Sequence, residues 1–234
     1  GRGDFSLISN QADPLIPGNT IIQSINQIAR STGEQMPRDT SITRWDETVK
    51  PKYVINETGY RAETIKYIID VLKNDIEILT NGHVKNATDS DIIRVTSSPT
   101  DLNGIVLFEL GITGVWEYLR SSDFHLYRGA RIKLGDGVTR GTASHELAHV
   151  LGHTGHYNSV VGSIMDNTIS VQNPSLIDAR NARIIWDRPA GSAKPDNDPR
   201  PVAGASSAAY VTSNSVRRYN STVQSQRQNI MRRH

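Results

Sequence analysis

The sequence predicts an α+β fold with a mixed sheet, because stretches of helical and of strand periodicity follow one another through its middle. The longest helical pattern spans 61–80, where apolar residues recur every three or four positions until Asn81 and Gly82. Short β-branched runs at 91–96 and 104–110 predict two buried strands. We therefore expect a twisted sheet backed by the 61–80 helix.

Two further segments complete the expected sheet. Residues 45–56 are rich in β-branched and aromatic side chains and predict the first strand. Residues 125–134 alternate between polar and apolar side chains and predict strands on either side of Gly129. The glycine-containing stretch before them, which carries Trp116 and Tyr118, is interpreted as a connection.

A second helical segment carries the residues with the clearest chemistry. His145, Glu146 and His149 form an H-E-x-x-H pattern. Residues four apart lie on one face of a helix, so the two imidazoles can bind one metal ion. The carboxylate between them can take a proton from a water on that metal. Thr142 is expected to cap the start of this helix, and Gly152 to end it in a left-handed conformation.

A catalytic zinc site needs a third protein ligand and an open position for water. His156 is the preferred third ligand, because the chain can turn back after Gly152 and Gly155 adds freedom to the loop. His153 is the alternative, since it would share the face of His149 if the helix continued through Gly152. The sequence thus predicts a Zn²⁺ site with Glu146 as the catalytic residue and the metal ligands His145, His149 and His156.

This stretch resembles the metzincin clan of zinc metallopeptidases, and in particular the matrixin-like catalytic domains. The clan motif is H-E-x-x-H-x-x-G-x-x-H followed by a turn that contains methionine. Here the third histidine comes one position late, and Ser163, Ile164, Met165 and Asp166 resemble the methionine turn. The resemblance implies that Met165 forms an apolar floor beneath the zinc, and that the helical pattern at 176–186 is the clan's C-terminal helix.

The resemblance also implies a function. In the clan, a water on the zinc is activated by the motif's glutamate and attacks a peptide carbonyl, and the proton then passes to the leaving amine. An antiparallel edge strand ahead of the zinc helix binds the peptide substrate by strand addition, which implies this role for residues 124–128. We therefore expect a zinc-dependent endopeptidase acting on proteins or peptides.

The expected organisation has three parts. Residues 1–44 form a polar extension in which Ile21, Ile22, Ile25 and Ile28 allow a short amphipathic helix, and residues 45–188 form the metzincin-like catalytic domain. Residues 189–234 form a Pro- and Ser-rich linker and a basic tail, which is able to dock a partner protein. Two alternatives to the peptidase therefore stay open: a zincin-shaped binding module, and a toxin subunit that is delivered through this tail.

Composition excludes several other classes. The net charge of +2 over 234 residues gives no general basis for binding nucleic acid, and no apolar run has the length of a membrane span. The absence of cysteine excludes disulfides and thiolate zinc ligands. The chain begins at Gly1 rather than Met, which is compatible with a removed signal peptide, and the expected location is extracellular.

Overall fold

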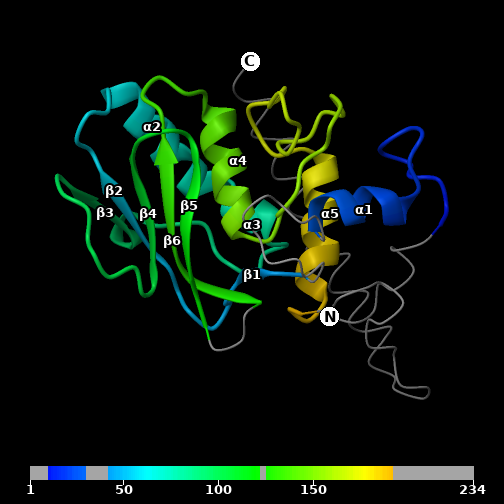
Figure 1. Ribbon diagram of the computed structural model, residues 1–234, viewed down its shortest axis with the longest axis horizontal. Coiled ribbons are helices and arrows are strands. Elements are labelled where there is room, and N and C mark those ends of the chain that lie inside the picture. The colour runs from blue at the N-terminus through cyan, green and yellow to red at the C-terminus, as the bar shows by residue number, and fades with distance from the viewer. Residues whose placement is uncertain (1–9, 30–41, 122–124, 192–234) are drawn as a thin grey trace.

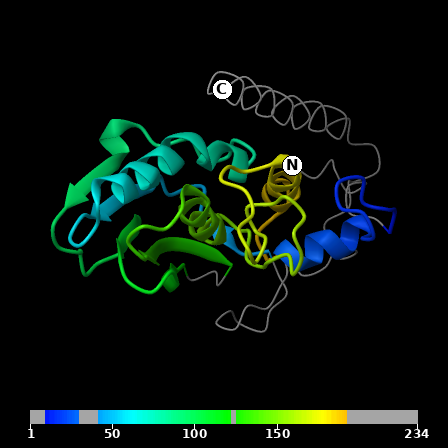
Figure 2. The ribbon, with the colours of Figure 1, turned by 90° about the horizontal axis from the view of Figure 1, so that it is seen from above.

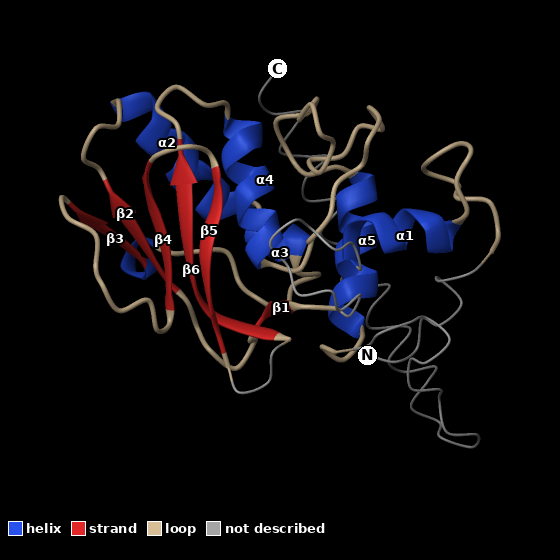
Figure 3. Ribbon diagram, in the orientation of Figure 1, coloured by secondary structure: helices blue, strands red, loops and turns tan. Residues whose placement is uncertain are grey.

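The computed structural model describes residues 10–29, 42–121 and 125–191, which form a mixed α/β fold (Figures 1 and 3). These residues contain the strands β1 Arg44–Trp45, β2 Lys52–Asn56, β3 Ile92–Val95, β4 Ile105–Leu110, β5 Gly114–Arg120 and β6 Leu126–Leu134. They also contain the α-helices α1 Ile21–Ala29, α2 Ala62–Asn74, α3 Ile76–Leu79, α4 Arg140–Val150 and α5 Leu176–Asp187, and a 3₁₀ turn, η2 Asp89–Asp91. The predicted mixture of helices with a mixed sheet is thus confirmed.

The six strands form one sheet in the order β1-β6-β4-β2-β3, with β5 paired to β6. All pairings are parallel except that of β5 with β6, which is antiparallel. The expectation that residues 124–128 form an antiparallel edge strand is wrong for its described part. Residues 126–128 belong to β6, which has neighbours on both sides, and residue 124 lies outside the described residues. The antiparallel strand is β5, where the sequence predicted only a connection.

One face of the sheet packs against the helices. Tyr53, Phe108 and Ile132, from β2, β4 and β6, are almost fully buried in the same core cluster as Leu72 of α2 and Leu147 of α4. In Figure 1 the sheet lies on the left, α4 in the centre, and α5 with α1 on the right. The opposite face has a smaller apolar cluster beneath the loop that precedes β4. Helix α4 is therefore held between the sheet and α5, at the centre of the molecule.

Two predicted elements are interrupted in the structure. The expected strand at 45–56 is two short strands, because Asp46 accepts hydrogen bonds from the amide and the hydroxyl of Thr48 and starts a turn. The expected helix at 61–80 is two helices that meet at Asp75, and Asn81 follows it with a φ of 50°. Both interruptions place a buried or half-buried aspartate at the break, where a side-chain interaction competes with regular structure.

The described part of the N-terminal extension belongs to the core. Helix α1 confirms the expected amphipathic helix, and its Ile25 and Ile28 are fully buried. Asp13, which precedes it, receives two hydrogen bonds from Arg180 of α5, at 3.0 and 2.9 Å. Figure 2 shows α1 beside the loops that follow α4. Residues 10–29 are therefore packed against the region that carries the predicted metal ligands.

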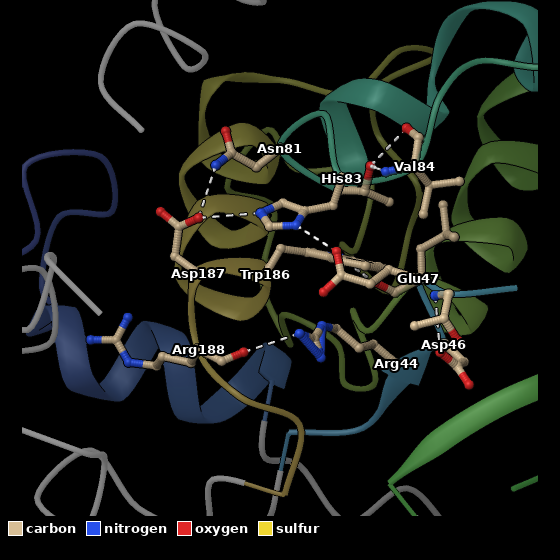
Figure 4. A network of polar contacts seen from close by, with 12 residues as sticks. Arg44, Asp46, Glu47, Asn81, His83, Val84, Trp186, Asp187 and Arg188 are labelled. Atoms are coloured by element: carbon tan, nitrogen blue, oxygen red, sulfur yellow. Dashed lines mark hydrogen bonds and ion pairs between the residues drawn. The ribbon is translucent and has the colours of Figure 1, made fainter. Parts of the chain in front are cut away.

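A polar network fixes the end of α5 against the start of the sheet (Figure 4). His83 Nδ1 lies 2.8 Å from Glu47 Oε2, and its Nε2 lies 3.4 Å from Asp187 Oδ1. The guanidinium of Arg44 lies 4.7 Å from the centre of the Trp186 ring. Three segments that are far apart in the sequence therefore meet at the end of α5.

No helix in the described part of the chain is long and apolar enough to cross a membrane. Most of the expected linker and all of the basic tail, residues 192–234, lie outside the described residues. The partner-docking role of that tail stays a prediction.

Candidate metal centre

Helix α4 presents the H-E-x-x-H residues near the middle of the molecule. It begins after Thr139, whose hydroxyl accepts the amide of Thr142, so the cap is three residues earlier than predicted. His145 and His149 lie one turn apart on the helix, and their ring centres are 4.8 Å apart. The helix thus points both imidazoles toward one place.

The chain then turns and brings a third imidazole to the same place. Gly152 has a φ of +105°, a conformation that favours glycine. A Cβ atom there would also lie 2.9 Å from side-chain atoms of both Arg44 and Ile185, so the close packing requires glycine as well. We call residues 151–157 the ligand loop. Its His156 Nε2 lies 3.1 Å from His145 Nε2 and 3.2 Å from His149 Nε2.

These distances match the needs of a metal ion. Two nitrogens bound about 2.0–2.1 Å from a tetrahedral zinc ion lie about 3.4 Å apart. The three ligand nitrogens of His145, His149 and His156, which we call the three-histidine cluster, all lie within 4.8 Å of one another. Within the described ranges, this is the one group of histidine and acidic side chains that could hold a metal ion. Imidazole nitrogens are suitable ligands for zinc, copper, iron and nickel ions.

Hydrogen bonds select the tautomer that a metal ion requires. His145 Nδ1 lies 2.7 Å from the carbonyl oxygen of Ile164, and His149 Nδ1 lies 2.8 Å from that of His153. A carbonyl only accepts, so each Nδ1 must carry the proton and each Nε2 keeps its lone pair. Such backbone contacts orient histidine ligands and raise their basicity.

The electrostatic environment keeps the cluster neutral. Burial lowers the pKa of His145 to about 4 and that of His149 well below its usual range, and it also lowers the pKa of His156. Protons therefore compete only weakly with a metal ion for these nitrogens at neutral pH. His156 is the most exposed of the three histidines, so the cluster is accessible to solvent on the side where His156 lies.

Glu146 is the titratable group that follows His145 of the cluster in the chain. Its side chain is buried, and this burial raises the pKa of its carboxyl group to about 7. A positive charge at the three nitrogens would favour the carboxylate and lower this pKa again. A carboxyl group near neutral pKa beside a metal site is suited to exchange protons as a general base and acid.

His153, the alternative third ligand, has a different place. Its ring is fully buried, and Nε2 donates to the carbonyl of Leu79 at 2.9 Å. Its backbone carbonyl holds His149, as described above. The structure therefore brings His156 to the cluster and uses His153 to tie the ligand loop to α3.

The turn at 163–166 and helix α5 hold His145 of the cluster in position through hydrogen bonds. The carboxylate of Asp178 in α5 accepts the hydroxyl of Ser163 at 2.5 Å and the amide of Ile164 at 3.0 Å. The carbonyl of Ile164 in turn accepts the proton of His145. Met165 in the same turn is fully buried. Asp178 therefore positions the candidate metal ligand His145 through the peptide unit of Ile164, a role that the sequence did not reveal.

A buried ion network fixes the first turn of α4. Arg140 donates to both oxygens of Asp75, at 2.9 and 2.8 Å, and to Asp70 at 2.6 Å. Ser144, which lies next to His145 in the chain, also donates to Asp75, at 2.8 Å. Sequence reasoning missed this network. One signal for it was present, because a basic residue at a helix N-terminus opposes the helix dipole and requires acidic partners.

Comparisons with known proteins gave no matching family model, no matching curated protein and no matching solved structure. The functional argument therefore rests on the motif and on the geometry of the site.

Proposed function

We propose that this protein is a zinc-dependent endopeptidase of the metzincin type. The observation that carries the proposal is the convergence of three imidazole nitrogens at one place. A buried glutamate, Glu146, directly follows His145 in the chain. His145, His149 and His156 would hold the zinc ion, and Glu146 would act on the substrate water. Three protein ligands leave a fourth tetrahedral position open, as catalysis requires.

Features outside the cluster support the same proposal. The turn with the buried Met165 lies between α4 and α5 and contacts His145 through Ile164. The antiparallel strand β5 pairs only with β6 among the described strands, so no described strand pairs with its other edge. Tyr118 in β5 is near enough to Glu146 for the glutamate charge to contribute to raising its pKa. The face of β5 that carries the Tyr118 side chain is therefore turned toward Glu146 of α4.

The mechanism follows from these positions. Bound zinc supplies a Lewis acid that acidifies water and polarises a carbonyl oxygen. An extended peptide pairs with the edge of β5 opposite β6 through its backbone, so that its scissile carbonyl is held near the cluster. Glu146 takes a proton from the attacking water and gives it to the nitrogen of the leaving amine. The charge of bound zinc would lower the pKa of this carboxyl group from its raised, metal-free value, which favours the carboxylate that acts as the base.

The decisive variant is Glu146→Gln, which keeps the shape of the side chain and removes the base. We expect zinc to stay bound, because the three imidazoles are unchanged, and casein hydrolysis to fall by about a thousandfold. The matched control is Glu63→Gln, since Glu63 is exposed in the first turn of α2. Metal content and hydrolysis are measured on the same samples, with and without a chelator.

Undiminished hydrolysis by Glu146→Gln would contradict the mechanism. A zinc-loaded chain that cleaves neither casein nor gelatin would favour the binding module instead. Extracellular location, and delivery or docking through residues 189–234, remain predictions from the sequence.

A further inference from the structure

The C-terminal end of α1 touches the loop that carries the third histidine. The carbonyl oxygen of Ile28 accepts the hydroxyl of Thr154 at 3.0 Å and the amide of Gly155 at 2.8 Å. Carbonyls in the last turn of a helix have no partner within the helix, so this oxygen is free to accept from elsewhere. The Ile28 carbonyl oxygen therefore accepts hydrogen bonds from two adjacent residues of the ligand loop.

These two contacts come immediately before His156. On its other side, the amide of Tyr157 donates to the carbonyl of Met165 at 2.9 Å. His156 therefore stands between an anchor to α1 and an anchor to the methionine-containing turn. The backbone on both sides is fixed, and the ring between them reaches the cluster.

The anchor in α1 is itself rigidly held. Ile25 and Ile28 are fully buried, and the ion pair between Asp13 and Arg180 joins the preceding segment to α5. Burial of Asp13 opposes its ionisation, but hydrogen bonds from Arg180, Ser24 and Leu15 still leave its pKa below the usual range. Charged, hydrogen-bonded pairs of this kind are costly to break once buried. Residues 11–29 thus form a fixed support rather than a loose leader.

We propose that residues 11–29 are a positioning element of the metal centre, which holds His156 in its binding position through Ile28, Thr154 and Gly155. The inference rests on the metal site of the proposed function. A loop ligand loses conformational entropy on binding a metal ion, and a loop that is already fixed loses less. With this support His156 is already in place for the metal, and without it the centre would keep only the two ligands of α4.

Thr154→Val tests this directly. Valine replaces the hydroxyl with a methyl group of similar size, and Ile28 keeps its bond from Gly155, so no buried acceptor is left unpaired. We expect zinc affinity to fall by about tenfold, the lower end for the loss of a contact that supports a metal ligand. Thr154→Ser keeps the hydroxyl and should bind zinc as the unaltered chain does.

The matched control is Thr64→Val. Thr64 is also buried and its hydroxyl bonds Asp136, but it lies in α2 away from the ligand loop. Zinc affinity is measured by competition with a chelating indicator. The visible absorption of bound Co²⁺, which reports coordination geometry, should change in Thr154→Val and stay unchanged in Thr64→Val.

A double-mutant cycle separates positioning from a general loss of structure. Thr154→Val should weaken zinc binding in the unaltered chain and have no further effect in a His156→Ala background. Unchanged affinity in Thr154→Val, or an equal loss in both backgrounds, would overturn the positioning role while leaving the metal site intact. Absence of zinc binding by the unaltered chain would overturn the proposed function as well.

Discussion

The two sides of the metal centre are held by different means. His145 and His149 share one helix, where a spacing of four residues places them on one face whatever the rest of the chain does. His156 stands on a loop, and one of the anchors of that loop, between Thr154 and Ile28, joins residues 126 positions apart in the sequence. The helix side can therefore be recognised from a short motif, whereas the loop side depends on the assembled fold.

The largest expected effect on metal binding is that of removing the loop ligand. Four-ligand zinc sites bind with about 10–16 kcal/mol, so one ligand contributes about 2.5–4 kcal/mol on average. We expect His156→Ala to weaken zinc binding by several hundredfold. His153→Gln keeps a donor for the carbonyl of Leu79 and should change zinc affinity by less than about threefold, since this residue is outside the cluster. A loss of affinity in His153→Gln that exceeds the loss in His156→Ala would reverse the assignment.

Breaking the ion network that holds the start of α4 should lower the free energy of unfolding. Asp75→Ala leaves the buried Arg140 without its bidentate partner, and we expect the free energy of unfolding in urea to fall by about 3–5 kcal/mol. The comparison variant is Glu57→Gln, which breaks the exposed ion pair with Arg94 and should cost less than about 1 kcal/mol. Equal losses in the two variants would show that the buried network of Arg140 and Asp75 stabilises the protein no more than an exposed ion pair does.

The buried glutamate should give a pH dependence with a definite sign. Folding raises the pKa of Glu146 from 4.5 to about 7, so the metal-free protein loses stability as pH rises through this window. Glutamine does not titrate. With a chelator present, Glu146→Gln should therefore match the unaltered chain near pH 4 and exceed it by at most about 3 kcal/mol above pH 7. A stability difference that stays constant with pH would contradict the burial of this charge.

The smallest expected effect concerns the methionine turn. Met165→Leu conserves volume in a fully buried position and should cost less than about 1.5 kcal/mol in the free energy of unfolding. Zinc affinity should stay within about twofold, because the contact to His145 is made by the backbone of Ile164. A large loss of zinc would mean that the methionine side chain itself holds the site together.

Several elements followed from local patterns, and the exceptions have physical causes. Helix α4, its end at Gly152 and helix α5 were predicted, because periodicity and capping residues act over short distances. Strand β5 was missed, since register shifts at Glu117 and Arg120 break its alternation of side chains. The break at Asp75 was also missed, because the apolar stripe continues across it into α3.

The candidate site could be predicted from the sequence only in part. The spacing rules pointed to His145, Glu146 and His149 and favoured His156 over His153 as the third ligand, but they left His153 open, since both histidines follow Gly152 within a few positions. The choice depends on contacts from Leu79 and Ile28, which no local pattern announces. Such contacts appear only when distant segments pack together.

The most direct test of the account is an anomalous difference map at the zinc edge, from a crystal grown without added metal. We expect one peak bound by His145, His149 and His156, with His153 still bonded to Leu79. A peak that is bound by His153 instead of His156, or no peak in an intact fold, would contradict the assigned metal centre.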